Sequence, residues 1–144
     1  MKTIFTLILF CLSLQAAQAA TDGDGFVRLL PEDVAFEEYR EGLVISYITG
    51  HPEQEGFYLL RIRFAPGAFS APHYHSTDRH VTVIKGTWYT GTGEHFDPDN
   101  TVPLPAGSFM LHPAGKAHFD GAKDEEVIVE IKGIGPVSSI NIPQ

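Results

Sequence analysis

Glycine and proline interrupt this chain at short intervals, and their spacing limits the elements that it can form. The sequence holds 14 glycines and 10 prolines among 144 residues, spread along the chain and not gathered in one linker. Because both residue types end regular structure, this spacing predicts many short elements joined by tight turns. The length fits one domain. We therefore expect one all-β domain, built as a sandwich or a barrel.

Segments rich in β-branched and aromatic residues mark the candidate strands between these interruptions. They are expected at residues 43–49, 57–64, 80–85, 87–90, 101–104, 108–112, 118–120 and 127–132. Gly86 separates two of them and marks a bend. Only residues 32–39 look helical, with Pro31 at the first position. A closed barrel is favoured because an open sheet of so many short strands would leave exposed edges.

The first 19 residues have the layout of a secretory signal peptide. Lys2 gives a positive start, residues 4–14 form an apolar run, and residues 17–19 offer a small-x-small cleavage site. The run is too short to span a bilayer, and a buried N-terminal helix is the alternative. We expect residues 1–19 to be removed and residues 20–144 to form the mature domain. The protein would then be exported, to the periplasm or outside the cell, without stable insertion in a membrane.

Composition limits the chemistry of the mature domain. Cys11, the one cysteine of the sequence, lies in the apolar run, so the mature domain would have neither a disulfide nor a thiolate ligand. The formal net charge is −8, with 10 lysines and arginines and no basic stripe. Because nucleic-acid binding needs clustered positive charge, we expect no nucleic-acid partner. Histidines, carboxylates, arginines and tyrosines remain as candidate functional groups.

A pair of histidines carries the first chemical signal. His73 and His75 are two residues apart, so both rings point to the same face of an extended segment. Two imidazoles on one face can bind one metal ion when a third ligand comes from elsewhere in the chain. Spacing alone leaves coincidence as an equal alternative.

Two longer segments resemble the conserved motifs of the cupin superfamily, G-x5-H-x-H-x3-E-x6-G and G-x5-P-x-G-x2-H-x3-N. The matching positions are Gly67, His73, His75, Gly86, Gly107, Pro113, Gly115 and His118. The resemblance implies a cupin-type double-stranded β-helix, a jelly-roll barrel, from about residue 27 to 131. It also implies a site in which His73, His75 and His118 bind a divalent metal ion, with Fe, Mn, Ni, Zn and Cu all open.

Two positions depart from these motifs. Arg79 stands where the family has its glutamate ligand, and Ala122 stands where it has asparagine. A guanidinium about 6 Å from a divalent ion would repel it by roughly 5 kcal/mol at an effective dielectric of 20. A metal still fits if Arg79 swings outward, or if an anionic ligand lies between them. Cupin dioxygenases similar to the cysteine and acetylacetone-cleaving enzymes use three histidines and no glutamate.

Three further residues are candidates for binding a substrate. Arg79 is expected inside the barrel with His80 outside, although a register slip would instead make His80 the fourth ligand. Asp120 shares a face with His118 in a regular strand, where it would orient an imidazole or stand in an exposed turn. Of two adjacent aromatic residues, Trp88 is taken as the one that lines the cavity or fills the core.

The remaining side chains near the motifs have simpler interpretations. Tyr74 should face away from its two neighbouring histidines. His112 is expected to be partly buried and satisfied by hydrogen bonds. Residues 78–91 resemble a group of uncharacterised, often exported bacterial cupins in which an arginine at this position is not unusual, and that resemblance implies no particular reaction.

Two functions follow as hypotheses. The first is a metal-dependent enzyme of the oxygenase, lyase or isomerase type, in which Arg79 neutralises a carboxylate or enolate of a small organic substrate. The second is a non-enzymatic cupin that binds a small molecule without a metal. A structural role for the barrel, as a homodimer, is a weaker third.

Overall fold

The computed structural model describes residues 20–143, which fall into two units that divide after Ala35. In the first unit, β1 (Ala20–Thr21) pairs antiparallel with β2 (Val27–Arg28), and a short 3-10 helix follows at Pro31–Asp33. The expected signal peptide lies outside the described residues. No helix in residues 20–143 is long and apolar enough to cross a membrane.

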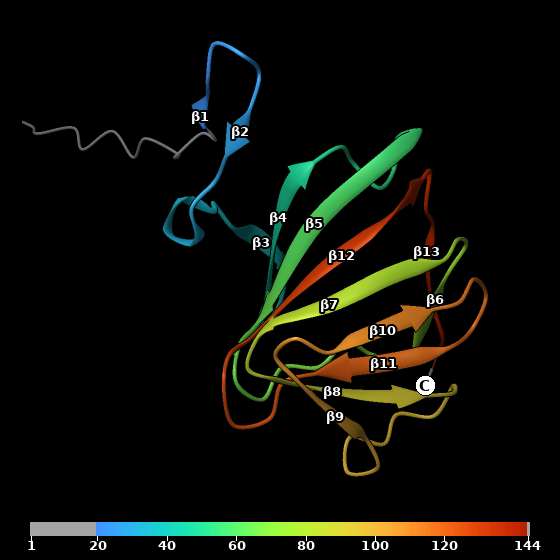
Figure 1. Ribbon diagram of the computed structural model, residues 1–144. Coiled ribbons are helices and arrows are strands. Elements are labelled where there is room, and N and C mark those ends of the chain that lie inside the picture. The colour runs from blue at the N-terminus through green and yellow to red at the C-terminus, as the bar shows by residue number, and fades with distance from the viewer. Residues whose placement is uncertain (1–19, 144) are drawn as a thin grey trace, which may run out of the picture. The chain divides into compact units, whose positions relative to one another are not determined.

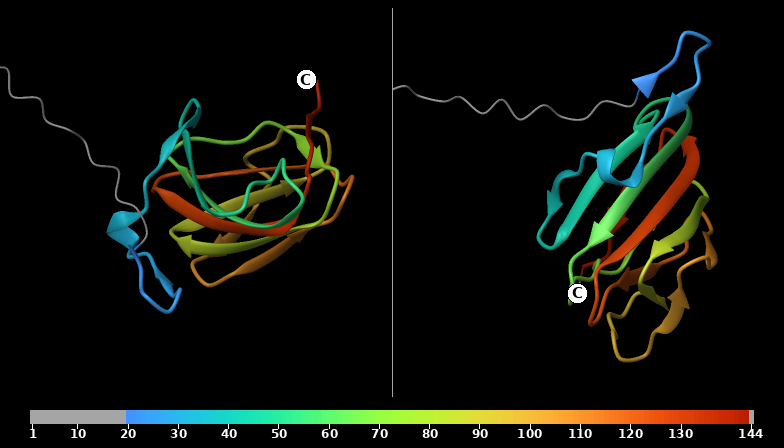
Figure 2. Two further views of the ribbon diagram at one scale, coloured as in Figure 1. Left: turned by 90° about the horizontal axis from the view of Figure 1, so that it is seen from above. Right: turned by 60° about the vertical axis from the view of Figure 1, so that its left-hand side comes forward.

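The second unit consists of two antiparallel sheets that wrap into a barrel (Figures 1 and 2). The six-stranded sheet has the order β10-β7-β12-β5-β4-β3. Its strands are β3 (Glu37–Arg40), β4 (Leu43–Thr49), β5 (Gly56–Phe64), β7 (Arg79–Lys85), β10 (Phe109–His112) and β12 (Val127–Gly135). The five-stranded sheet has the order β13-β6-β11-β8-β9. Its strands are β13 (Ser139–Asn141), β6 (His73–His75), β11 (His118–Gly121), β8 (Thr87–Thr92) and β9 (Val102–Pro105). The all-β jelly-roll prediction is confirmed.

The eight predicted strands correspond to β4, β5 and β7 to β12. The predicted helix at residues 32–39 is wrong. Pro31 does begin a helical turn, but it ends at Asp33, and β3 begins at Glu37 as the edge strand beside β4. Glu37 faces Ile45 across the sheet. Pairing with a neighbouring strand therefore overrides a weak local helix signal.

Alternating side chains build the core of the barrel. In β12, Val127, Val129 and Ile131 are buried and the residues between them are less so, which is the period of two that a half-buried strand requires. Trp88 of β8 enters the same core from the five-stranded sheet and is only 1% exposed. Burial of each such side chain contributes about 1.5–3 kcal/mol.

Gly86 makes the bend between β7 and β8 that the sequence predicts. Its φ is +74°, a conformation that side chains with a Cβ rarely adopt, and a Cβ there would lie 2.5 Å from the carbonyl oxygen of Glu126. The bend carries the chain from one sheet to the other. Arg79 on β7 and Trp88 on β8 therefore belong to different sheets, and both face the interior of the barrel.

Candidate functional site

A cavity of about 520 Å³ opens inside the second unit and is lined by residues of both sheets. Apolar side chains of the six-stranded sheet, among them Leu60 and Ile131, line it together with polar groups. The polar groups include four histidines, which we call the histidine cluster: His73, His75, His112 and His118. All four are buried.

Strand pairing brings the two sequence motifs together. His73 of β6 lies directly opposite His118 of β11, and the centroids of the two rings are 4.4 Å apart. The ring of His75 lies 5.2 Å from that of His118. One nitrogen from each of the three rings lies within 4.8 Å of the others, so this group could hold a metal ion.

Backbone carbonyls set the tautomer of two of these rings. Nδ1 of His73 lies 2.8 Å from the carbonyl oxygen of Ala71, and Nδ1 of His118 lies 3.0 Å from that of Lys116. Because a carbonyl oxygen only accepts, Nδ1 carries the proton and Nε2 keeps its lone pair. Nε2 of His118 is buried without a hydrogen-bond partner among the described residues. A buried, partnerless lone pair on an oriented imidazole fits a metal ligand.

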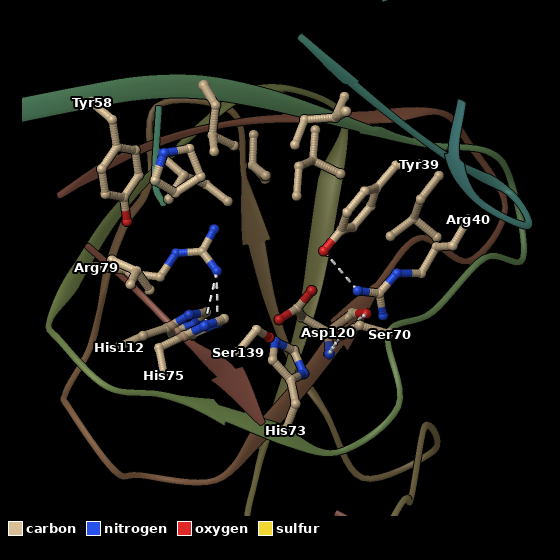
Figure 3. Close-up of a pocket in the computed structure, with 18 of the residues that line it drawn as sticks. Tyr39, Arg40, Tyr58, Ser70, His73, His75, Arg79, His112, Asp120 and Ser139 are labelled. Carbon is tan, nitrogen blue, oxygen red and sulfur yellow. Dashed lines mark hydrogen bonds between the residues drawn. The ribbon is translucent and has the colours of Figure 1, made fainter. Parts of the chain in front are cut away.

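Arg79 points into the barrel. It lines the cavity, whereas its neighbour His80 is exposed, so the register slip that would make His80 a ligand is wrong. Nη1 of Arg79 lies 2.6 Å from Nε2 of His75 and donates a hydrogen bond to it. The hydroxyl of Tyr58 lies on the other side of the guanidinium (Figure 3). Arg79 therefore occupies the interior beside the cluster.

Burial keeps the cluster uncharged. It lowers the pKa of His112 to about 2, and it lowers the pKa of His75 further, with the guanidinium of Arg79 adding to the effect. The pKa of His118 is also lowered by burial, although the carboxylate of Asp120 opposes that shift. Metal ions bind neutral imidazole, so these rings are in the protonation state that a metal requires.

The environment of His112 differs from the one expected from the sequence. It is 4% exposed, and neither ring nitrogen has a hydrogen-bond partner among the described residues, so it is not satisfied by hydrogen bonds. Its ring centroid is 3.7 Å from that of His118, and it lies opposite Arg79 across the β7–β10 pair. The direction of its side chain depends on that pairing, which the local sequence does not reveal.

Asp120 and Trp88 both face the cavity. Asp120 is 5% exposed and its carboxylate points inward, so the alternative of an exposed turn residue is wrong (Figure 3). Its backbone N–H and carbonyl both bond the hydroxyl of Ser70, which holds the strand in place. Trp88 fills core and lines the cavity at once, with its ring 5.6 Å from that of His112. Tyr74, as expected, lies outside this cavity's lining.

A family model described as "ChrR Cupin-like domain" matches residues 26–137. The chain belongs to the ChrR cupin-like family. The spacing of its histidines and glycines is therefore that of a cupin, with Arg79 as a departure from the superfamily's ligand pattern.

Solved structures agree on the fold of this cupin. The polyketide cyclase RemF from Streptomyces resistomycificus is similar with a TM-score of 0.65 and 19% identity, covering 81% of this chain and 85% of that one. Rru_A2000 from Rhodospirillum rubrum, a cupin-2 domain, has a TM-score of 0.64 and 14% identity over 88% of this chain and 83% of that one. KdgF from Halomonas sp. has a TM-score of 0.58 and 14% identity, covering 74% of this chain and 91% of that one. These identities show a shared fold alone. No curated protein matches the chain.

Proposed function

We propose that this cupin binds a divalent metal ion at the histidine cluster and a small anionic organic ligand beside it. The orientation of His118 carries the proposal, because it donates Nδ1–H to the carbonyl of Lys116 and its Nε2 is buried without a partner among the described residues. His73 is oriented in the same way by the carbonyl of Ala71. His75 completes a three-histidine set whose ligand atoms lie within 4.8 Å of one another. Such a set suits Fe, Mn, Ni, Zn or Cu.

Arg79 supports an anionic ligand. Its Nε is buried without a hydrogen-bond partner, and no ion pair joins it to a carboxylate within residues 20–143. A buried cation without a paired anion is costly, so a ligand carboxylate or enolate entering the cavity would be favoured by its guanidinium. Asp120 and Trp88 line the same cavity and would contact that ligand.

An oxygenase, lyase or isomerase is the reaction class that these groups would serve. A metal bound here would act as a Lewis acid on an oxygen of the ligand. Arg79 would stabilise negative charge that develops on the ligand in the transition state. The apolar wall that includes Leu60 and Ile131 would exclude water from it.

One observation favours a second function, a cupin that binds a small molecule without a metal. The hydrogen bond from Arg79 occupies Nε2 of His75, which removes a lone pair from the three-histidine set. In that case the histidines would serve as hydrogen-bonding groups for the ligand.

Metal analysis of protein purified without a histidine tag separates the two functions. The protein is loaded anaerobically with Fe(II), Mn(II), Ni(II) or Zn(II), dialysed, and analysed for metal per chain. Near-stoichiometric metal that is lost in His118→Gln supports the proposal. Only trace metal in the wild-type protein contradicts it and leaves the metal-free function.

We also propose that the protein is exported after removal of residues 1–19. The positive start, apolar run and Ala17-Gln-Ala19 site support this. N-terminal sequencing of protein from a cell fractionation tests it. A mature N-terminus at Ala20 in the periplasm or medium supports export, and an intact N-terminus in the cytoplasm contradicts it.

A further inference from the structure

His112 is the most unusual polar group of the described interior. It is 4% exposed, yet both of its ring nitrogens lack a hydrogen-bond partner among the described residues. Buried polar side chains almost always have a partner, so an orphaned imidazole needs an explanation. Neutral imidazole always keeps one lone pair, and a metal ion is a partner that would use it.

His75, by contrast, already has a partner. Nη1 of Arg79 lies 2.6 Å from its Nε2 and 3.3 Å from its Nδ1. A guanidinium has no acceptor, so the lone pair of His75 is the acceptor in this contact. The same lone pair cannot bind a metal ion while it accepts that hydrogen bond. Among the three histidines at the motif positions, His73, His75 and His118, His75 is therefore the least available to bind a metal ion.

Two groups beside His112 are suited to complete a site. The ring of His118 lies 3.7 Å from that of His112 between centroids, and its Nε2 is buried without a partner. Asp120 lies two residues further along β11, is 5% exposed, and points its carboxylate into the same cavity (Figure 3). One ligand atom from each of the three residues lies within 4.8 Å of the other two.

We propose that His112, His118 and Asp120 form the metal site of this cupin, a set of two imidazoles and one carboxylate. The proposal rests on the metal binding proposed above but changes two of its ligands, with His112 and Asp120 in place of His73 and His75. Two histidines and a carboxylate are a ligand set of first-row divalent ions such as Fe(II), Mn(II) and Co(II).

Charge favours this set over three histidines. Three neutral imidazoles bring no negative charge to a site beside Arg79, whereas Asp120 brings one as a direct ligand. The hydrogen bond between Arg79 and His75 is kept. The carboxylate that the superfamily supplies on the strand of Arg79 would then come from β11, on the opposite sheet.

Titration of tag-free protein with Co(II) tests the ligand set. Isothermal calorimetry gives the affinity, and the visible absorption of bound Co(II) reports its ligands independently. We expect Asp120→Asn and His112→Gln each to weaken Co(II) binding at least about tenfold and to change the absorption bands, because each removes a ligand. His75→Gln should cause a smaller loss of Co(II) affinity than either of these substitutions. His80→Gln is the matched control, since it removes an exposed histidine of β7 that faces away from the cavity.

The outcomes separate this inference from the metal binding on which it rests. If the wild-type protein binds no Co(II), the proposed function fails. If it binds Co(II), and His75→Gln abolishes binding while Asp120→Asn and His112→Gln retain wild-type affinity and spectrum, the ligand set proposed here is overturned. Circular dichroism checks each variant. Should His112→Gln not fold, Asp120→Asn decides, because the carboxamide has the shape of the carboxylate and lacks its charge.

Discussion

Nη1 of Arg79 lies 2.6 Å from Nε2 of His75, so a residue in the position of the superfamily's glutamate donates a hydrogen bond to a candidate metal ligand. The contact joins β7 of one sheet to β6 of the other across the barrel. A glutamate carboxylate at this position would attract a metal ion, whereas the guanidinium of Arg79 would repel it. If the protein binds metal and an anionic ligand as proposed, Arg79 would couple the affinity for one to the charge of the other.

Replacing Arg79 should strengthen metal binding. Arg79→Glu removes a repulsion of roughly 5 kcal/mol, calculated for a separation of about 6 Å, and we expect at least a tenfold gain in Zn(II) or Co(II) affinity by calorimetry. Lys85→Glu makes the same change of charge at an exposed position of the same strand and should have little effect. Equal affinities for Arg79→Glu and wild type would mean that the guanidinium leaves the site when metal binds.

Stability of the metal-free protein should fall as the pH falls below the ordinary histidine pKa of 6.5. Burial lowers the pKa of His75 and His112, so both stay neutral in the folded protein while the unfolded chain takes up protons. Each such histidine lowers the free energy of unfolding by about 1.4 kcal/mol for every pH unit below 6.5. Above pH 6.5 it has no effect, because the histidine is then neutral in both states.

Urea unfolding in EDTA between pH 7.5 and 5 measures this loss. His112→Gln should flatten the dependence by about one proton. His80→Gln, at an exposed position, is the control and should not change the slope. A free energy of unfolding that stays level from pH 7 to 5 would show that the histidines of the cluster take up protons in the folded protein as they do in the unfolded chain.

Trp88 should report metal binding directly. It is the single tryptophan of the sequence, and its ring lies 5.6 Å from that of His112. Open-shell ions such as Co(II), Ni(II) and Cu(II) quench a nearby indole, so we expect saturable loss of fluorescence at one ion per chain. Zn(II), with a filled d shell, should bind without comparable quenching. Quenching that is weak and unsaturable would place the ion outside this cavity.

Gly86 should tolerate no side chain. Gly86→Ala forces a Cβ into a conformation with φ of +74° and against the carbonyl of Glu126, and should lower the free energy of unfolding by about 2 kcal/mol or more. Gly23→Ala has no atom within 4 Å of its Cβ and should change it by less than about 0.5 kcal/mol. Similar urea midpoints for the two variants would refute a strained bend at Gly86.

Local patterns predict much of the barrel. Alternating β-branched and aromatic residues are enough to place β4, β5 and β12, because their period of two reflects burial of one face. They fail for β3 and for β6, whose three residues His73–His75 pair with other strands but carry little strand signal of their own. Such short strands exist because neighbours supply their hydrogen bonds.

The sequence by itself determined the all-β fold, the bend at Gly86 and the gathering of His73, His75 and His118 at one site, since each depends on residue spacing within a strand or on a motif. Only the tertiary structure decided that His112 is buried without a partner, that Asp120 faces inward and that Arg79 bonds His75. Those facts depend on the register between strands far apart in the chain, such as β7 with β10. A shift of the register by one residue moves every side chain of a strand to the opposite face of the sheet, and no local pattern specifies that register.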